Sequence, residues 1–309
     1  MRGMVIRGVG SSLPAQRLTN VDLESMMDTT DDWIADRTGI RERRIGGSTS
    51  DMAIEASRIA IERSGIDPAT IELVVLSTTT PDQQVPATAP TVQAALGLNC
   101  GAIDVNAACS GFTYGLIASA GMIALGSGPV LVVGSDALSR ITDYHDRGTG
   151  ILFADGAGAA VVTPVDGPGS LLGWDLGTDG SARGILYADI GSVLMMDGKE
   201  VFRRAVRVMA SSAQNAMQRA GVTIDDINLC IPHQANIRII DAAIQRLGIP
   251  MERTVTNLER VGNTSSGSIP LALDEAVQAG RIADGDLVLV CGFGAGMTWA
   301  SCVLRWGAA

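Results

Sequence analysis

Apolar residues along this chain gather in short runs that alternate with longer stretches of helical spacing. The short runs predict buried strands at 71–80, 101–108, 129–136 and 157–165, and again at 227–233, 286–294 and 298–306. The first ten residues are also strand-like. The stretches 110–125 and 235–247 carry apolar residues on one helical face, and a glycine follows each of them. This alternation predicts an α/β fold in which helices cover a sheet.

The strand-like runs recur at a nearly constant distance along the chain. The run that ends at Ser77 matches the run that ends at His233, 156 residues later. Leu131 and Leu287 occupy matching runs and are also 156 residues apart. A period of this size indicates duplication of a whole strand-and-helix unit and not a short solenoid repeat.

The duplication predicts two halves, 1–166 and 167–309, and a site between them. Cys109 and Asn263 are 154 residues apart, and each precedes a helix start rich in glycine and serine. A pseudo-twofold axis would bring these two helix starts toward one centre. We therefore expect Cys109, His233 and Asn263 to line a common site.

The overall charge excludes some classes of partner. The chain has 309 residues and a net charge of −10, with 23 Lys and Arg against 33 Asp and Glu. Such acidity disfavours a nucleic-acid surface or an anionic membrane as the main partner. No apolar run approaches the roughly 18 residues that span a bilayer, and the N-terminus has no signal-peptide core. We expect a soluble, cytoplasmic protein.

The cysteines are scattered, without a C-x-x-C motif or paired histidines. This spacing indicates neither a zinc site nor a disulfide framework, so we expect free thiols and no metal. The five positions are Cys100, Cys109, Cys230, Cys291 and Cys302.

Cys109 differs from the other cysteines in its position between a strand and a helix. Unpaired backbone N–H groups and the positive end of the helix dipole stabilise a thiolate at such a position. A thiolate there could attack a thioester carbonyl. Position alone leaves a second interpretation open, that of a buried structural cysteine.

His233 and Asn263 also have two interpretations each from position alone. His233 lies between a strand and a helix in I-P-H-Q-A-N, and it is either a structural residue or a catalytic one. Asn263, in G-N-T-S-S-G-S, is either a turn or N-cap residue or a partner of Cys109. His145, in a charged stretch, is expected to be an exposed loop residue.

Two glycine-rich segments could be mistaken for phosphate loops. The segment 292–296, G-F-G-A-G, lacks the Lys-Ser/Thr pair of a P-loop and leads into another strand. A tight turn that presents a backbone N–H to an oxyanion suits it better. The segment 155–160, D-G-A-G-A-A, indicates close strand packing.

A set of motifs, each weak alone, together resembles the beta-ketoacyl-acyl-carrier-protein synthase III family. They occur in the family's order over essentially the whole chain: D-W-I-x-x-R-T-G-I-x-x-R (32–43), N-A-A-C-S-G-F (106–112), D-R-G-T (146–149), D-G-A-G (155–158), P-H-Q-A-N-x-R (232–238), G-N-T-S (262–265) and F-G-A-G-M-T-W (293–299). The resemblance implies a thiolase-like fold of two duplicated halves in five layers, α-β-α-β-α, and a homodimer.

The resemblance also implies an activity, initiation of fatty-acid chains. Cys109 would take an acyl group from acyl-CoA, and His233 with Asn263 would assist decarboxylation of malonyl-acyl carrier protein, giving a 3-oxoacyl product. The backbone N–H groups of Cys109 and Ala295 would form the oxyanion hole. No bound cofactor is implied, because acyl-CoA is a substrate.

Further residues match the family's binding positions. Trp33, Arg37 and Arg147 would flank the CoA adenine and its phosphates, and Asn236 would contact the pantetheine. Arg203 and Arg238 match basic residues that would receive the acidic carrier protein. The acyl pocket would include Val85, Leu152, Phe153 and Phe293. Val85 would reach the partner's pocket, where the family often has phenylalanine.

Other functions remain to be separated. Elongating ketoacyl synthases use a second histidine where this chain has Asn263, and thiolases use a second cysteine that Cys291 does not match. A relative with the same three residues could acylate or condense a substrate that is not carried by acyl carrier protein. From a different class, the chain could be an inactive acyl-binding partner subunit.

Overall fold

Continuous apolar runs form the central strands of two sheets, because helices cover both faces of each sheet. Strands β4 (Leu73–Ser77), β6 (Val130–Ala137) and β12 (Leu287–Gly294) are buried at every residue. The computed structural model describes residues 2–307. Within these residues no helix is both long enough and apolar enough to cross a membrane.

The other elements are named in chain order. The remaining strands are β1 (Arg2–Ser12), β2 (Gln16–Thr19), β3 (Glu42–Ile45), β5 (Gly101–Val105), β7 (Asp155–Asp166), β8 (Leu171–Thr178), β9 (Leu186–Tyr187), β10 (Met195–Met196), β11 (Leu229–Pro232) and β13 (Thr298–Arg305). The helices are α1 (Asn20–Glu24), α2 (Asp31–Thr38), α3 (Thr49–Ser64), α4 (Thr88–Ala95), α5 (Gly111–Ala124), α6 (Gly198–Ala220), α7 (Ile237–Leu247), α8 (Leu258–Val261) and α9 (Ser268–Gln278).

The two main sheets share one topology. The first has the order β1-β7-β6-β4-β5, and the second has the order β8-β13-β12-β11. In both, the first two neighbouring pairs are antiparallel and the next pair is parallel. An isolated parallel bridge from Cys230 to Thr254 stands where β5 pairs with β4 in the first sheet. The predicted duplication is therefore present in the fold.

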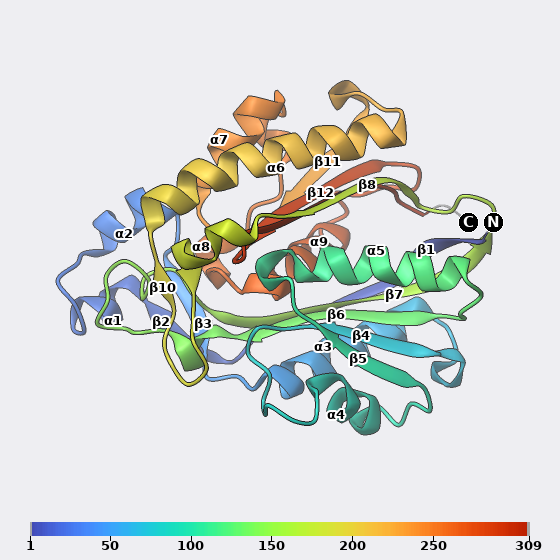
Figure 1. Cartoon of the computed structure of the whole chain (residues 1–309), viewed down its shortest axis with the longest axis horizontal. Coiled ribbons are helices and arrows are strands. Elements are labelled where there is room, and N and C mark those ends of the chain that lie inside the picture. Colours follow the sequence, from blue (N-terminus) through green and yellow to red (C-terminus); the bar gives the residue numbers. More distant parts are fainter. Residues whose placement is uncertain (1, 308–309) are drawn as a thin grey trace.

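Helices and sheets form five layers (Figure 1). Helices α3 and α4 cover the outer face of the first sheet, and α6 and α7 cover the outer face of the second. Helices α5 and α9 lie between the sheets and contact both. The thiolase-like α-β-α-β-α fold class expected from the sequence is confirmed.

The middle layer joins the two sheets through one apolar core. Phe112 and Leu116 of α5 and Ile269 of α9 pack with Val132 of the first sheet and Val290 of the second. Each such side chain contributes roughly 1.5–3 kcal/mol when it is removed from water. This shared core fixes the two helix starts relative to each other.

The starts of α5 and α9 are built in the same way. The Ala108 N–H donates to Asn106 Oδ1 at 3.2 Å, and the Ser265 N–H donates to Asn263 Oδ1 at 2.9 Å. Ala108 and Ser265 both have positive φ angles, 48° and 51°. A non-glycine residue in this left-handed region is uncommon, so its presence at both helix starts marks equivalent positions.

This equivalence corrects the pairing expected from the sequence. The counterpart of Cys109 is Ser266, and the counterpart of Asn263 is Asn106, at a common offset of 157 residues. The prediction that Cys109 pairs with Asn263 was wrong by three residues, because glycine- and serine-rich helix starts align in more than one register.

The predicted strands are present, most of them with shorter bounds, whereas β7 is longer than the predicted 157–165. The predicted strand 71–80 ends at Ser77, because Thr79 leaves the sheet and its N–H donates to the buried Asp136 at 2.7 Å. Strand β5 is not the buried strand we expected. It lies at the edge of its sheet, and Ile103 on it is 46% exposed.

Candidate active site

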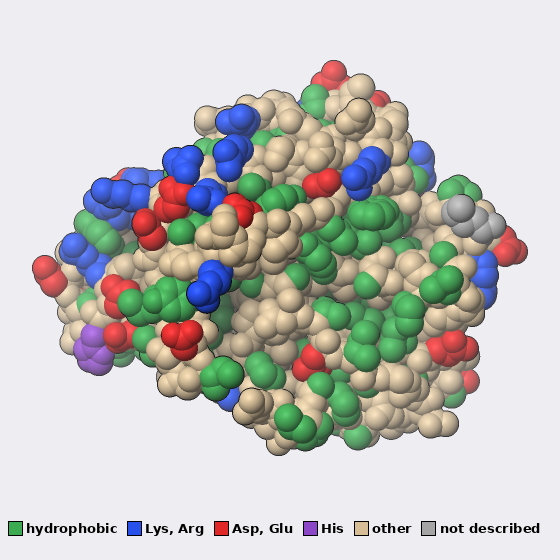
Figure 2. Space-filling model, in the orientation of Figure 1, with side chains coloured by type: hydrophobic (Ala, Val, Ile, Leu, Met, Phe, Trp, Pro, Cys, Tyr) green, Lys and Arg blue, Asp and Glu red, His purple; other side chains and the backbone are tan. Residues whose placement is uncertain are grey.

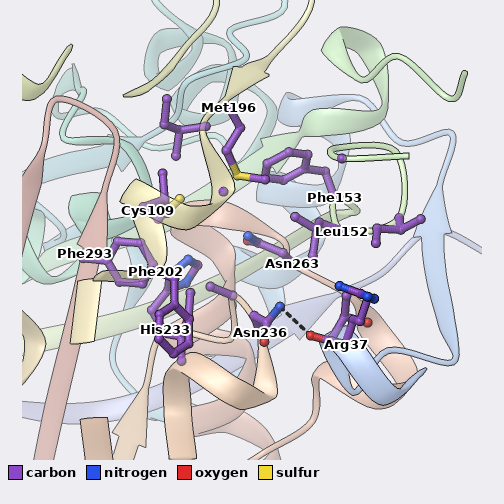
Figure 3. A pocket seen from close by; sticks show the side chains of 18 of the residues that line it. Arg37, Cys109, Leu152, Phe153, Met196, Phe202, His233, Asn236, Asn263 and Phe293 are labelled. Carbon is purple, nitrogen blue, oxygen red and sulfur yellow. Dashed lines mark hydrogen bonds between the residues drawn. The ribbon is translucent and has the colours of Figure 1, made fainter. Parts of the chain in front are cut away.

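The predicted residues Cys109, His233 and Asn263 meet at one cavity of about 250 Å³ (Figure 3). Each is buried, and each comes from the end of a different element near the seam between the two sheets. Phe293 of β12 also lines this cavity. The three residues that we expected at a common site therefore line one cavity.

Cys109 lies in the 3₁₀ turn Ala108–Ser110 that leads into α5. Its backbone nitrogen lies close to β12, where a Cβ added to Gly294 would come within 2.6 Å of it. Burial raises the pKa of the Cys109 thiol to about 12, against a lowering by a hydrogen bond from Ser265. Burial thus opposes the thiolate that the helix end favours, a cost that position in the sequence does not show.

His233 follows β11 and is held on two sides. Its N–H donates to the carbonyl of Cys291 at 2.8 Å, and its ring lies edge-on to Phe293 at 5.5 Å between centroids. Burial lowers the pKa of His233 to about 3, so the imidazole is neutral near pH 7.

Ser268, the first residue of α9, hydrogen-bonds to the ring of His233. The Ser268 hydroxyl lies 2.6 Å from His233 Nδ1 and accepts the Gln234 N–H at 3.4 Å. With its oxygen engaged as an acceptor, the hydroxyl can donate its proton to Nδ1. In that arrangement the ring proton is on His233 Nε2, which is then a hydrogen-bond donor.

Asn263 is fixed through both its backbone and its side chain. Its N–H donates to the Leu152 carbonyl at 3.0 Å, and its carbonyl accepts the Ala154 N–H at 2.9 Å. The side-chain oxygen accepts the Ser265 N–H. The amide NH₂ group is thus left for the cavity, where it offers a neutral donor.

The turn after β12 lies against Cys109 and the residues before it. Thr298 Oγ1 donates to the carbonyl of Ala107 at 2.8 Å and lies 3.2 Å from the carbonyl oxygen of Ala295. Asp179 and Met297 exchange two backbone hydrogen bonds of 2.8 Å that fix the other side of the turn. This arrangement holds Ala295 beside Cys109, as the oxyanion-hole hypothesis requires.

A second cavity of about 320 Å³ also reaches Cys109. Phe153 lines both cavities, whereas Leu152 and Phe293 line only the first. Both residues therefore lie with Cys109 in the first cavity, and their assignment to an acyl pocket stays a prediction. Val85 lines neither cavity in the single chain and is 80% exposed. The second cavity is otherwise mainly apolar, with Leu138, Ile141, Leu186 and Leu194.

The mouth of the first cavity carries the expected cationic and aromatic groups. The guanidinium groups of Arg37 and Arg147 each lie 4.5 Å from the centre of a Trp33 ring. Arg147 also donates to the carbonyl of Asp28 at 3.0 Å. Asn236 lines the cavity while its side chain donates to the carbonyl of Arg37 at 3.0 Å.

Basic side chains gather around α2, α6 and α7 (Figure 2). Arg203 pairs with Glu200 at 2.6 Å, and Arg238 pairs with Asp36 at 2.8 Å. Hydrogen bonds from Arg203 lower the pKa of Glu200 to about 2. These arginines are exposed yet partly neutralised, so each retains only part of its attraction for an acidic partner.

Sequence reasoning missed several residues of the site. Ser268 was part of the G-N-T-S-S-G-S run but had no assigned role, and its position at the start of α9 could have indicated one. Met196 and Phe202 also line the first cavity, and no sequence motif marked them. Among residues 2–307, no group of His, Cys, Asp and Glu is arranged to hold a metal ion.

Comparisons with known proteins agree with this geometry. The family model described as 3-oxoacyl-[acyl-carrier-protein] synthase III matches residues 103–180, and the model for the C-terminal part of that synthase matches residues 217–306. The beta-ketoacyl-[acyl-carrier-protein] synthase III of Geobacillus kaustophilus is 48% identical, with 99% of each chain covered.

Solved structures give the same result. The 3-oxoacyl-[acyl-carrier-protein] synthase III from Aquifex aeolicus has a TM-score of 0.96 at 42% identity, covering 98% of this chain and 100% of that one. The priming beta-ketosynthase from the R1128 polyketide pathway has a TM-score of 0.93 at 40% identity, covering 99% of this chain and 97% of that one. Full-length identity of this degree, joined to the buried cysteine, histidine and asparagine, means that the chain belongs to the 3-oxoacyl-[acyl-carrier-protein] synthase III family.

Proposed function

We propose that this protein is an initiating condensing enzyme of fatty-acid biosynthesis. An acyl group passes from acyl-CoA to Cys109 and is then condensed with malonyl-acyl carrier protein to give a 3-oxoacyl-acyl carrier protein. The observation that carries the proposal is one buried cavity that holds a thiol together with two neutral hydrogen-bond donors, His233 and Asn263.

In the first step the Cys109 sulfur attacks the thioester carbonyl. The negative oxygen that develops would accept the N–H groups of Cys109 and Ala295. The CoA sulfur leaves, and the proton lost by the Cys109 thiol ends on it. The N-terminus of α5 stabilises the sulfur while it carries charge during the transfer, against the cost of burial.

In the second step the malonyl thioester oxygen accepts hydrogen bonds from His233 Nε2–H and from the Asn263 amide. Loss of CO₂ leaves an enolate whose negative charge these two donors stabilise. The enolate carbon attacks the acyl carbonyl, and the Cys109 sulfur leaves and regains a proton. Neutral donors suit this step, because neither must lose a proton before the enolate forms.

The nucleotide end of CoA would bind at the mouth of the first cavity. Trp33 offers a flat surface to the adenine, Arg37 and Arg147 offer guanidinium groups to the phosphates, and Asn236 contacts the pantetheine. Acyl-CoA is a substrate here, and no bound cofactor is part of the proposal. The cavity already joins this mouth to Cys109, which supports the assignment.

Replacement of Arg37 or Arg147 by alanine should raise KM for acyl-CoA by about tenfold, since each loses a charged contact to phosphate. The KM for an acyl-pantetheine that lacks the nucleotide should change little. Steady-state kinetics with both donors provide the test. Arg58→Ala, on the outer helix α3, serves as the control. If KM rises equally for acyl-CoA and for the acyl-pantetheine, these arginines have a structural role.

The protein would act as a cytoplasmic homodimer, with malonyl-acyl carrier protein as its second substrate. The open edge of β5 and the exposed Val85 supply a surface that a second copy could cover. Arg203 and Arg238 would receive the acidic carrier protein. Residues 1–166 and 167–309 would form the duplicated halves, in agreement with the topology shared by the two sheets.

The second cavity would hold the acyl chain, with Phe153 and Leu186 among its walls. Its volume of about 320 Å³ exceeds what an acetyl group needs. We expect the wild-type protein to accept acyl-CoAs longer than acetyl. Each further buried CH₂ contributes about 0.8 kcal/mol at best, which is enough to shift the preference several-fold.

Val85→Phe should narrow this preference toward acetyl-CoA, because the added ring would enter the partner's acyl cavity. Competition between acetyl-CoA and longer acyl-CoAs, followed by intact mass of the protein, measures the shift. Val21→Phe places the same ring on exposed α1 and should leave the preference unchanged. Self-acylation of the wild type by acetyl-CoA alone would reject the prediction.

The proposed function is tested by two measurements on the wild-type protein. Intact mass after incubation with a panel of acyl-CoAs should show a single acyl adduct, whose size names the primer. The acylated protein should then release CO₂ from malonyl-acyl carrier protein and form the 3-oxoacyl product. No adduct with any acyl-CoA would instead indicate an inactive acyl-binding subunit.

A second candidate is a priming or acylating role in a specialised-metabolite pathway. Similarity to the R1128 priming ketosynthase, at 40% identity, favours considering it. This candidate predicts acylation of Cys109 without condensation when malonyl-acyl carrier protein of fatty-acid synthesis is the only acceptor. The CO₂ measurement therefore separates the two.

A further inference from the structure

Arg43 is a charged residue for which the proposed reaction has no use. It lies on β3, closes the D-W-I-x-x-R-T-G-I-x-x-R motif, and is completely buried. Within residues 2–307, no carboxylate lies within 4 Å to pair with its guanidinium. Burial lowers the pKa of Arg43 to about 10, so it keeps its charge near pH 7. An unpaired buried charge is unfavourable unless its hydrogen bonds serve a purpose.

The guanidinium of Arg43 joins two segments far apart in the sequence. Nη1 donates to Asn20 Oδ1 at 2.6 Å, and Nη2 donates to the carbonyl of Ile151. Asn20 cannot turn away, because its Nδ2 donates to the carbonyl of Ile40 at 2.7 Å and to Asp31 Oδ1 at 2.8 Å. Asn20 is therefore held in place. Because Arg43 hydrogen-bonds to both residues, it fixes Ile151 relative to Asn20.

Ile151 begins the segment that holds Asn263. The next residue, Leu152, accepts the Asn263 N–H at 3.0 Å, and Ala154 donates to the Asn263 carbonyl at 2.9 Å. These two bonds form a parallel bridge between Phe153 and Asn263. Arg43 therefore holds this segment two residues before the bridged residue Phe153.

The stem of Arg43 also packs against the other side of the bridge. Gly262 has a φ of 73°, and a Cβ placed on it would lie 3.1 Å from Arg43 Cγ and 2.9 Å from Ala154 Cβ. The glycine just before Asn263 is thus held between the arginine stem and the Ile151–Ala154 segment. Arg43 therefore contacts the residues that lead into both partners of the bridge, Ile151 through a hydrogen bond and Gly262 through packing.

Lysine cannot reproduce this arrangement. The planar guanidinium directs two donors along fixed and diverging lines, whereas an ammonium group is a compact charge on a flexible stem. A hydrophobic residue would fill the space but leave the Asn20 and Ile151 oxygens without their donors.

We propose that Arg43 is a positioning residue that sets the place of the Asn263 amide by holding the Ile151–Ala154 segment against it. The inference rests on the proposed function for one point only, namely which catalytic step the position of the Asn263 amide affects. That step is malonyl decarboxylation, in which Asn263 donates to the enolate. Acylation of Cys109 does not use this amide and should proceed without the correct placement.

The test is Arg43→Lys, with the two half-reactions measured separately. Release of CO₂ from malonyl-acyl carrier protein should fall about tenfold or more, because small displacements of a catalytic donor have large effects. The rate of Cys109 acylation, followed by intact mass, should stay within about threefold. Arg44→Lys is the matched control, since Arg44 is its half-buried neighbour on β3 and donates to the carbonyl of Pro14.

A double variant separates positioning from general destabilisation. In an Asn263→Ala background, Arg43→Lys should have almost no further effect on decarboxylation, because the donor it positions is gone. A full further loss in that background would overturn the proposal, as would an equal loss of both half-reactions in the single variant.

Hydrogen exchange gives a readout that does not depend on activity. In Arg43→Lys the amides of Asn263 and Ala154 should exchange at least about tenfold faster, while amides in α3 stay unchanged. Should Arg43→Lys fail to fold, Asn20→Ala removes the anchor and should give the same pattern more weakly. Unchanged exchange in both would overturn the inference, even if the wild type proved inactive in condensation.

Discussion

Cys109→Ala should abolish acyl transfer from acyl-CoA and lower condensation by about a thousandfold or more, because no other group can form the thioester. Cys230, Cys291 and Cys302 are buried in the second sheet, away from the cavity. Intact mass after incubation with acyl-CoA measures the adduct directly.

The control for this variant is Cys100→Ala. Cys100 is the cysteine that is only partly buried, and it could acquire a nonspecific adduct. Its replacement should leave acylation at the wild-type level. Cys109→Ala should still decarboxylate malonyl-acyl carrier protein slowly, because His233 and Asn263 are untouched. A covalent acyl adduct that persists on Cys109→Ala would show that Cys109 is not the nucleophile.

His233→Ala and Asn263→Ala should each lower malonyl decarboxylation by about a hundred- to a thousandfold, the usual loss for one donor to a developing negative charge. Self-acylation should fall much less, because the α5 N-terminus and the oxyanion turn remain. The two half-reactions are measured as CO₂ release and as intact mass.

Matched controls are available for both residues. His145→Ala removes an exposed histidine, and Asn215→Ala removes an amide on α6 that bonds Asp175. Neither should affect the half-reactions. Equal loss of acylation and decarboxylation in the His233 and Asn263 variants would show that the two roles are not separate.

The low pKa of His233 predicts how decarboxylation responds to pH. With a pKa of about 3, the imidazole gains a proton only near that pH and stays a neutral donor throughout the neutral range. Decarboxylation should therefore not change between pH 8 and pH 6 on account of His233. A decline centred near pH 6.5 would mean that the histidine titrates as an ordinary exposed group.

Much of the fold could be predicted because burial leaves a direct mark on sequence. Strands β4, β6 and β12 are covered on both faces and so appear as unbroken apolar runs. Helix α6 was not identified, although it is long, and the edge position of β5 was not visible in its composition. Edge or centre depends on which strands pair, and that depends on distant parts of the chain.

The sequence predicted which residues form the site, but it did not predict their pKa values or their hydrogen-bond partners. The motifs named Cys109, His233 and Asn263, yet the pKa of Cys109 follows from burial by groups spread over the chain. The contact of Ser268 with His233 joins residues 35 positions apart. Arg43 reaches across 108 residues to Ile151. No local pattern encodes such contacts.

The matching turns at Asn106 and Asn263 have a consequence for how such a site could arise. Two identical half-length chains paired about an axis would carry the same residue at both helix starts, either two thiols or two serines. Here Ser266 stands where the first turn has Cys109, and Asn263 lines the first cavity whereas Asn106 lines the second. Joining the copies in one chain frees each turn to change alone, so that one becomes the attacking group and the other the charge stabiliser.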